Sequence, residues 1–226
     1  MCPYPTPVNA RKIQDNYSIE GHIVSSTLQK LVMASNNKGK LAEFSALLSP
    51  LNIHVIPQGE LNVPEADEPH VTFLENALVK ARHASQITGL PALADDSGIC
   101  VPVLGNAPGV LSARYAGEPK SDERNNQKLV AELAGQTDRR AFYYCVLVMV
   151  LHAEDPRPIV AEGMWHGVVQ EHPAGDGGFG YDPYFWLPEH GCTAAEMRKE
   201  DKNAISHRGQ AIQSLLVKLR ESGLVA

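Results

Sequence analysis

The chain has 226 residues, 43% of them hydrophobic and 20% charged, and a formal net charge of −6 at pH 7. These values are typical of a globular protein with one large domain or two small lobes. The acidic balance argues against a protein that wraps a nucleic-acid duplex, which needs an extended basic surface, so we expect no stable nucleic-acid partner. A small phosphorylated ligand is compatible with it, because a few local lysines and arginines can hold one.

Cysteines, histidines and apolar runs exclude further classes of protein. The four cysteines are widely spaced and form no C-x-x-C pair, which favours a reducing, cytoplasmic location over a disulfide framework. The nine histidines are scattered, so a zinc site is not expected. The longest apolar run, 141–152, is too short to span a membrane and is rich in aromatic and β-branched residues, which predicts a buried strand and no membrane partner.

The start of the chain differs from the rest. It holds three early prolines and mixed charges, shows no clear period, and lacks the apolar core of a secretory signal. We expect a loosely ordered extension at 1–29, with a docking arm as the alternative, ahead of a single domain at 30–226.

The first half of the chain alternates predicted strands and helices. A capping box, Thr72 and Glu75, opens one of the helices, which we expect to end at Gly89. In chain order the expected elements are a strand at 31–35, a helix at 39–48 stopped by Pro50, a strand at 53–57, an irregular acidic segment at 58–70, a helix at 72–88, and a strand, turn and second strand within 91–104.

The second half predicts an antiparallel region and a final helix. The expected elements are a helix at 121–133, a long strand at 141–152, a hairpin-like pair at 158–162 and 165–171, a glycine-dense loop at 174–183, a strand at 184–188 and a helix from about 203 to 221. Because the first strand–helix–strand unit suggests parallel pairing, we expect an α/β fold with a central twisted mixed β-sheet flanked by helices. A second lobe is expected from residues 122–186.

The polar loop SNNKGK, residues 35–40, directly follows the first predicted strand and leads into a helix. Such a turn aims backbone N–H groups and the positive end of the helix dipole at one point, which suits an anion such as phosphate. It is not a Walker A loop, because G-x-x-x-x-G-K-[ST] does not occur in this chain. An ordinary strand-to-helix turn with two solvated lysines is the alternative.

Two adjacent carboxylates, Asp95 and Asp96, follow an apolar stretch and precede Ser97 and Gly98. A turn at the end of a strand can bring both acids toward one cleft, where they would need a partner. Mg²⁺ is the natural partner, because it takes hard oxygen ligands and bridges to phosphates. The acidic segment around Glu68 could complete the site. Acids that merely cap a turn, and a solvated acidic loop, are the alternatives.

Three further segments are candidates for contact with a nucleotide. Lys80 lies on a polar helix face, where a solvated lysine is the alternative. The loop 175–183 combines many glycines with Phe179 and Tyr181, whose flat rings suit a base, and a long hairpin loop is the alternative. Segment 202–210 places cations at a predicted helix start, which makes sense if an anion lies there; an exposed basic turn is the alternative.

Together these segments suit a nucleoside triphosphate with Mg²⁺. SNNKGK, TFLENALVKARHA, LADDSG, APGVLSARYAG, GGFGYDP and KNAISHRG, in this order and spacing, resemble the Ham1-like family of noncanonical purine NTP pyrophosphatases, which includes inosine triphosphatases. The resemblance covers the chain from about Leu31 onward. It implies an elongated fold of two lobes with the active-site cleft between them, a homodimer, and Mg²⁺-dependent hydrolysis of ITP, dITP and XTP to the monophosphate and pyrophosphate.

The resemblance also implies roles for single residues. Asp96 matches a general base that also binds the metal, and Lys80 matches a lysine beside the phosphates. Asp95 and Glu68 match acids near the metal. The residues that would hold the triphosphate and the base are Ser35, Asn36, Asn37, Lys38, Gly39, Lys40, Ser97, Phe179, Gly180, Tyr181, Asp182, Lys202, His207 and Arg208.

Two other functions remain open from the residues alone. An NTP phosphatase would attack the γ-phosphorus and release orthophosphate, and a nucleotide- or RNA-binding module would not turn its ligand over.

A donor such as His207 or Arg208 can bond a 6-oxo purine but not a 6-amino purine, which accounts for rejection of ATP. The sequence offers no account of how GTP, which also carries a 6-oxo group, is rejected.

Overall fold

The computed structural model describes residues 28–48 and 53–225. Nearly all of the predicted extension at 1–29, and Pro50, the expected stop of the first helix, lie outside the described residues. Within this part of the chain, none of the helices combines the length and the apolar character needed to cross a bilayer.

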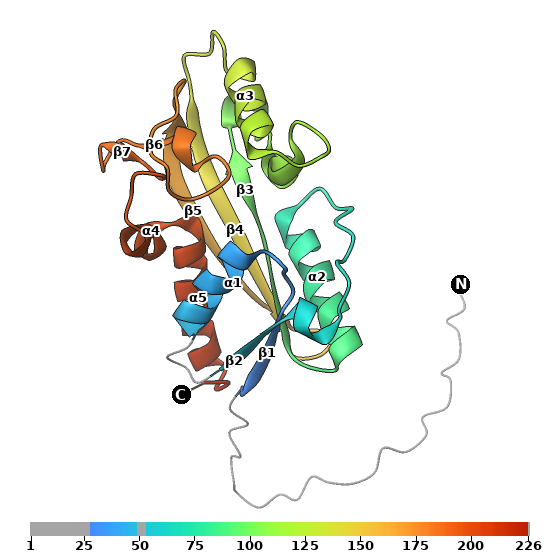
Figure 1. Ribbon diagram of the computed structural model, residues 1–226. Coiled ribbons are helices and arrows are strands. Elements are labelled where there is room, and N and C mark those ends of the chain that lie inside the picture. Colours follow the sequence, from blue (N-terminus) through green and yellow to red (C-terminus); the bar gives the residue numbers. More distant parts are fainter. Residues whose placement is uncertain (1–27, 49–52, 226) are drawn as a thin grey trace, which may run out of the picture.

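A seven-stranded mixed sheet forms the centre of the molecule, with strand order β2-β1-β3-β4-β5-β6-β7 (Figure 1). β1 pairs in parallel with both β2 and β3, and every later pair is antiparallel. The expected mixed sheet is therefore confirmed. The strands are β1 (Lys30–Met33), β2 (His54–Pro57), β3 (Ala92–Cys100), β4 (Arg140–Val150), β5 (Ile159–Val169), β6 (Phe185–Leu187) and β7 (Cys192–Thr193).

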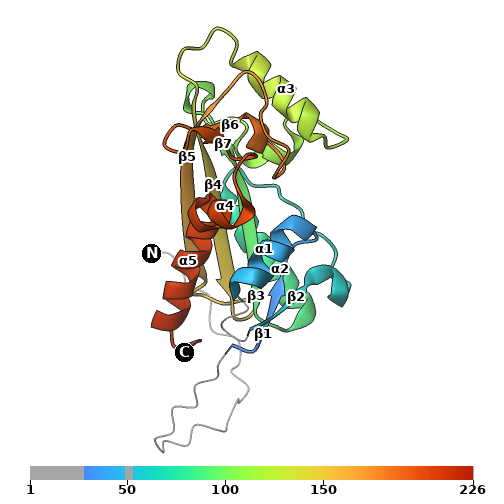
Figure 2. The ribbon, with the colours of Figure 1, turned by 60° about the vertical axis from the view of Figure 1, so that its left-hand side comes forward.

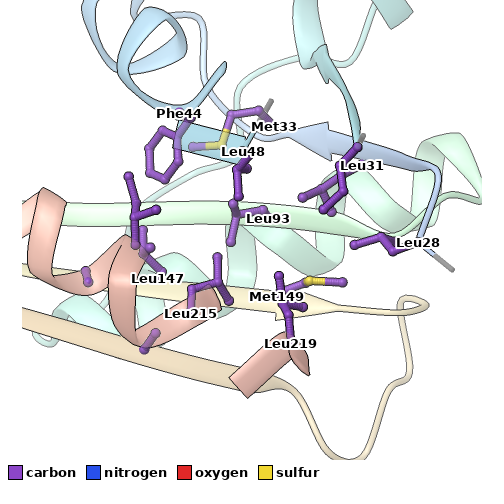
Figure 3. Packing of buried hydrophobic residues seen from close by; sticks show 14 of the residues in the cluster. Leu28, Leu31, Met33, Phe44, Leu48, Leu93, Leu147, Met149, Leu215 and Leu219 are labelled. Carbon is purple, nitrogen blue, oxygen red and sulfur yellow. The ribbon is translucent and has the colours of Figure 1, made fainter. Parts of the chain in front are cut away.

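Helices cover the two faces of the sheet. They are α1 (Lys38–Leu48), α2 (Phe73–Thr88), α3 (Asp122–Glu132), α4 (Lys199–Ile205) and α5 (His207–Glu221). α1 and α5 bury Phe44, Leu48, Leu215 and Leu219 against one face, as Figure 3 shows. α2 buries three alanines, 77, 81 and 84, against the other face.

The molecule is elongated along the two longest strands. β1 and β2 lie toward one end of β4 and β5, whereas α3, β6 and β7 lie toward the other end (Figures 1 and 2). A separate aromatic core, which includes Tyr143, Trp165 and Phe185, fills the second end. The long strands thus run from this aromatic core to the apolar clusters that α1, α5 and α2 cover.

Several predicted boundaries agree with the structure because local capping decides them. Thr72 accepts a hydrogen bond from the Glu75 N–H at the start of α2, and Gly89 ends this helix in the left-handed region with φ 67°. Ser121 accepts from the Arg124 N–H at the start of α3. In each case a short polar side chain satisfies a helix N–H group that has no partner inside the helix.

The expected strand, turn and second strand within 91–104 is wrong. β3 runs unbroken from Ala92 to Cys100 because it pairs with β4 at nine consecutive positions. Gly98 lies inside the strand, and the glycine marks a close approach of the chain rather than a turn. A Cβ at this position would overlap the Gly109 carbonyl and the Ser112 hydroxyl. The place predicted for a turn is therefore the middle of a buried strand.

The expected hairpin at 158–171 and the single last helix are also wrong. β5 is one continuous strand, and its Gly163 lets α5 approach closely, because a Cβ there would overlap the His207 carbonyl and lie 2.6 Å from the Ala211 nitrogen. The last helix is broken at Ser206, whose hydroxyl accepts from the Gly209 N–H and so starts α5 anew.

Replacing Gly163 with alanine should destabilise the fold, because the added methyl group would force α5 away from β5. Overpacking of this kind costs about 1–3 kcal/mol, and we expect urea unfolding to show a loss of that size. Met164→Ala is the matched control, since Met164 lies next in the strand and is 39% exposed. Equal stability of the two variants would show that the contact between α5 and β5 is not tight.

Candidate functional site

The candidate site lies where β1 separates from β3. The two strands pair only at Val32 with Ala92 and at Met33 with Leu93. The chain then turns away through loop 34–37 into α1, while β3 continues alone on that side with Asp95, Asp96 and Ser97. Such a divergence of neighbouring strands leaves room for a ligand at the ends of the strands.

Loop 35–40 is held by its own side chains. The Asn37 side-chain oxygen accepts from the N–H groups of Gly39 (2.9 Å) and Lys40 (3.1 Å) and so caps α1. The Ser35 hydroxyl accepts from the Asn37 N–H, and Asn36 donates to Glu65 at 3.2 Å. Two of the helix N–H groups expected to face an anion are thus already paired. The side chain of Lys38 lies outside the described part of the structure.

Alternation along β3 places the two adjacent acids on opposite faces of the sheet. Leu93 packs into the core under α1 and α5, whereas Ala94 packs into the core under α2. Asp95 lies two residues after Leu93, on the same face, and contacts α1 and α5. Asp96 lies two residues after Ala94, on the other face, and contacts α2. The expectation that a strand end turns both acids toward one cleft is therefore wrong.

Asp95 is the centre of a buried ion-pair network. Its carboxylate lies 2.7 Å from Lys40 Nζ and 3.8 Å from Arg208 Nη2, and its side chain is 1% exposed. Burial alone would raise its pKa, but the charges of Lys40 and Arg208 outweigh burial and hold the pKa well below its ordinary value. Asp95 therefore stays ionised and fixes both cations beside β3. Arg208 Nη2 also donates to the Ser97 hydroxyl at 3.3 Å.

Asp96 has the opposite electrostatic setting. Lys80 Nζ bridges Asp96 Oδ1 (3.2 Å) and Glu68 Oε1 (2.6 Å), and Arg114 Nη1 holds the other Glu68 oxygen at 3.3 Å. Burial raises the pKa of Asp96, and the nearby carboxylates Glu68 and Asp95 add to it, against the attraction of Lys80. The buried Asp96 Oδ2 has no hydrogen-bond partner among the described residues.

The three predicted metal-site acids are thus not gathered into one cluster. Glu68 and Asp96 share Lys80, but Asp95 pairs with Lys40 on the other face. Within residues 28–48 and 53–225 no group of three or more His, Cys, Asp or Glu side chains is arranged to hold a metal. Lys80 is half-buried and paired with two acids, so the alternative of a solvated lysine is wrong. Its pKa is raised, since burial is outweighed by the neighbouring carboxylates.

The glycine-dense loop meets loop 35–40 and segment 202–208. Phe179 is 44% exposed, and its ring centroid lies 5.4 Å from Lys202 Nζ and 5.9 Å from Arg208 Cζ. A Cβ on Gly39 would lie 4.0 Å from Phe179 Cε1, so the ring also lies against the first turn of α1. Segments far apart in the sequence therefore converge on one exposed aromatic ring.

Tyr181 does not offer a face to a ligand, and that expectation is wrong. It is 4% exposed within the aromatic core, and its hydroxyl donates to the Ser112 carbonyl at 2.8 Å. Asp182 is buried as well, where it accepts from Lys202 Nζ (2.5 Å) and from the Phe179 N–H (2.8 Å). These two residues hold the loop in place, and Phe179 is left to face outward.

His207 and Arg208 lie in the first turn of α5 and are 7% and 4% exposed, so the alternative of an exposed basic turn is wrong. The His207 ring stacks on Tyr143 with centroids 4.7 Å apart. Burial, followed by the charges of Arg208 and Lys202, lowers the pKa of His207 well below its ordinary value, so the imidazole is neutral. His207 Nδ1 and Arg208 Nε are buried with no partner in the part of the chain that is described.

Two residues of the site were missed in the sequence. Glu43 lies 2.6 Å from Arg208 Nη1 and stands three residues after Lys40, on the same face of α1. Arg114 binds Glu68 from a 3₁₀ turn that follows β3. The i, i+3 spacing from Lys40 was a local signal for Glu43. Arg114 lies within the motif APGVLSARYAG, but no local pattern indicated its contact with Glu68, which spans 46 residues.

Comparison with known proteins identifies the family. The model of the Ham1 family matches residues 31–218. The chain belongs to the Ham1 family. It is 65% identical over 196 residues to a protein of Ralstonia nicotianae named dITP/XTP pyrophosphatase, covering 85% of this chain and 98% of the relative. A protein of Nitrosomonas europaea with the same name is 63% identical over 198 residues, with 88% and 98% covered.

Solved structures of the Ham1 family share the fold. A HAM1 protein from Coxiella burnetii superimposes with a TM-score of 0.82 at 48% identity, covering 85% of this chain and 98% of that one. The Ham1 protein of Staphylococcus aureus gives a TM-score of 0.78 at 40% identity, with 85% and 99% covered. The α/β fold with its mixed sheet is therefore the fold of this Ham1 chain.

Replacing the two neighbouring acids with asparagine should have contrasting effects on stability. Asp95→Asn leaves the half-buried Lys40 without its acidic partner and leaves Arg208 with Glu43 alone, which costs about 3 kcal/mol. Asp96→Asn removes a charge that burial disfavours, so we expect a change within about 1 kcal/mol. Urea unfolding at pH 7 measures both.

The difference between wild type and Asp95→Asn should depend on pH. The pKa of Asp95 is lowered in the folded state, so its contribution is fully present above the unfolded value of about 4 and is lost as the pH falls further. The gap in unfolding free energy should therefore narrow below about pH 4. Similar losses for the Asp95 and Asp96 variants at pH 7 would contradict the assigned electrostatics.

Proposed function

We propose that this Ham1 protein hydrolyses the purine nucleoside triphosphates ITP, dITP and XTP to the nucleoside monophosphate and pyrophosphate. It thereby removes noncanonical nucleotides from the nucleotide pool. The proposal is carried by Asp96, a buried acid beside Lys80 whose Oδ2 has no hydrogen-bond partner among the described residues. The chain is 58–65% identical to relatives named dITP/XTP pyrophosphatase.

The α2 face of the site fits a divalent cation. Asp96 Oδ2 is a buried acceptor without a described partner, and Glu68 is held next to Asp96 through their common Lys80. We assign these two carboxylates as the residues that would hold Mg²⁺, a cation that takes hard oxygen ligands. When bound, Mg²⁺ supplies positive charge that offsets the negative charge of the phosphates. Asp95 is not included, since it is paired with Lys40.

Asp96 is also the proton acceptor of the reaction. It orients a water molecule and takes its proton as the water oxygen attacks the α-phosphorus. The bond from that phosphorus to the bridging oxygen breaks, and pyrophosphate leaves with the bonding electron pair. Burial raises the pKa of Asp96, which makes it a stronger base than an exposed aspartate.

Two lysines balance the charge that moves onto pyrophosphate. Lys40 stands at the start of α1, beside loop 35–40, and Lys80 stands on α2, so the triphosphate is approached from both faces of β3. Each lysine is held in place by an aspartate of the strand, so its position is set before substrate arrives. Preorganised charges of this kind stabilise the transition state most effectively.

The base is read at the other end of the site. Phe179 offers an exposed ring for stacking. The Nε–H of Arg208, which has no acceptor in the described part of the chain, is a donor for a 6-oxo group. A 6-amino purine presents a donor at the same place and would leave the Nε–H of Arg208 without an acceptor, which is costly in a buried site. Ser97, Lys202 and the neutral His207 complete the surroundings of the base.

We further propose the assembly and setting of the enzyme. It works as a homodimer without a nucleic-acid partner, with residues 30–226 as one domain and the substrate cleft between the β1–β2 end and the α3 end. The match of the family model to residues 31–218 supports these domain bounds. The free, buried thiols of Cys100 and Cys145 support a reducing, cytoplasmic setting.

The products test the reaction directly. With Mg²⁺ present, we expect pyrophosphate from ITP, dITP and XTP, and little from ATP or GTP. Parallel assays for pyrophosphate and orthophosphate distinguish the site of attack. Orthophosphate as the main product would move the attack to the γ-phosphorus, and tight binding without any product would indicate a binding module.

Substituting Asp96 with asparagine should abolish turnover but spare nucleotide binding. General-base catalysis contributes about 10²–10⁴-fold, so kcat should fall by at least 10². ITP binding is measured separately by calorimetry. Asp67→Asn is the control, because Asp67 is an exposed acid of the same segment as Glu68, and its kcat should match wild type. An Asp96→Asn variant with near-normal kcat would overturn the assigned base.

A further inference from the structure

Phe179 is an exposed ring on a glycine-dense loop, and such a loop needs restraint to hold a ring in place. Gly178 and Gly180, on either side of Phe179, both lie in the left-handed region, with φ 73° and 63°. Glycine has the widest conformational freedom of any residue. If the loop were free, ordering it would subtract from the affinity for a base.

A clamp from α3 supplies this restraint at Gly180. The Gly180 N–H donates to Asp122 Oδ2 at 2.8 Å, and the Gly180 carbonyl accepts from Asn126 Nδ2, also at 2.8 Å. Asp122 and Asn126 are four residues apart and therefore lie on the same face of α3. Two side chains thus fix both backbone polar groups of the residue that follows Phe179.

The helix that carries this clamp is itself anchored. Ser121 caps its first turn, and Asn125 holds the preceding loop through the Ala116 N–H (2.7 Å) and the Ala113 carbonyl (3.2 Å). Leu129 and Leu133 are buried in the aromatic core. α3 is therefore a fixed support, and its hydrogen bonds define where Gly180 lies.

We propose that Asp122 and Asn126 are positioning residues, which hold the Phe179 ring where it stacks on the purine base and so set the affinity for substrate without touching it. This inference rests on the proposed function and gives α3 a part in binding the purine base. Asp182 fixes the Phe179 N–H from the other side, so the ring is held between two restraints.

The effect on binding can be separated from an effect on stability. Asp122 is exposed, and Gly180 is only partly buried. Removing the Asp122 carboxylate therefore leaves a backbone N–H that water can reach, and the fold should lose little stability. The loop, by contrast, should lose order. Asn126 is a less suitable test residue, because it is 5% exposed and its loss leaves a gap.

The experiment compares Asp122→Ala with Glu123→Ala. Glu123 is the neighbouring acid in the first turn of α3, but its side chain accepts a hydrogen bond from Gln127 within the same helix. Both variants lose one charge near the helix N-terminus. For ITP we expect Asp122→Ala to raise KM about five- to tenfold with kcat within about twofold, the size of one lost hydrogen bond. Glu123→Ala should keep the wild-type KM, and Asp122→Asn, which retains an acceptor, should restore most of it.

Two further readouts decide whether Phe179 carries the effect. In a Phe179→Ala background, adding Asp122→Ala should raise KM by less than about twofold, because the ring to be positioned is gone. In the absence of nucleotide, amide hydrogen exchange over residues 178–181 should be faster in Asp122→Ala than in Glu123→Ala. This second readout does not require any activity.

Each outcome supports or overturns the inference. An equal KM in the Asp122→Ala and Glu123→Ala variants, a full KM effect in the Phe179→Ala background, or unchanged exchange at 178–181 would each overturn it. If none of the purine triphosphates is hydrolysed by the wild-type protein, the proposed function fails instead. Hydrogen exchange then still decides whether α3 clamps the loop.

Discussion

The unbroken pairing of β3 with β4 is the constraint on which the rest of the site depends. It keeps β3 extended through Asp95 and Asp96, two charged residues in the middle of a buried strand. Burying carboxylates is costly unless cations lie beside them. α1 and α5 supply Lys40 and Arg208 on one face, and α2 supplies Lys80 on the other. The helices around the sheet are thus fixed by charge as well as by apolar packing.

The two faces of β3 divide the chemistry. On the α1–α5 face Lys40 and Arg208 lie beside Asp95, so Asp95 stays ionised and orders these two cations. On the α2 face, burial and then the nearby carboxylates raise the pKa of Asp96, and its Oδ2 has no hydrogen-bond partner among the described residues. Two acids whose pKa values shift in opposite directions can therefore be neighbours in sequence, because the strand separates their surroundings.

The end of the molecule that holds α3, β6 and β7 fixes the position of the exposed Phe179 ring. Tyr181 and Asp182 anchor the glycine-dense loop in the aromatic core, and α3 holds Gly180 from outside. The long strands β4 and β5 join this end to the ion-pair network around β3 (Figure 2). Asp96 and the anchors of the loop that carries Phe179 are therefore joined by a continuous sheet rather than by a flexible linker.

The sequence by itself determined the mixed α/β fold, the family and most helix boundaries. Periodicity, capping residues such as Thr72 and Ser121, and the motifs around Ser35, Asp96 and His207 are local signals that need no knowledge of distant neighbours. Only the tertiary structure decided that β3 is unbroken, that Tyr181 is buried, and that Glu43 and Arg114 join the site. The physical reason is that strand continuity and burial depend on partners far along the chain, such as β4 for Ser97 and Ser112 for Tyr181. No local pattern in the sequence specifies those partners.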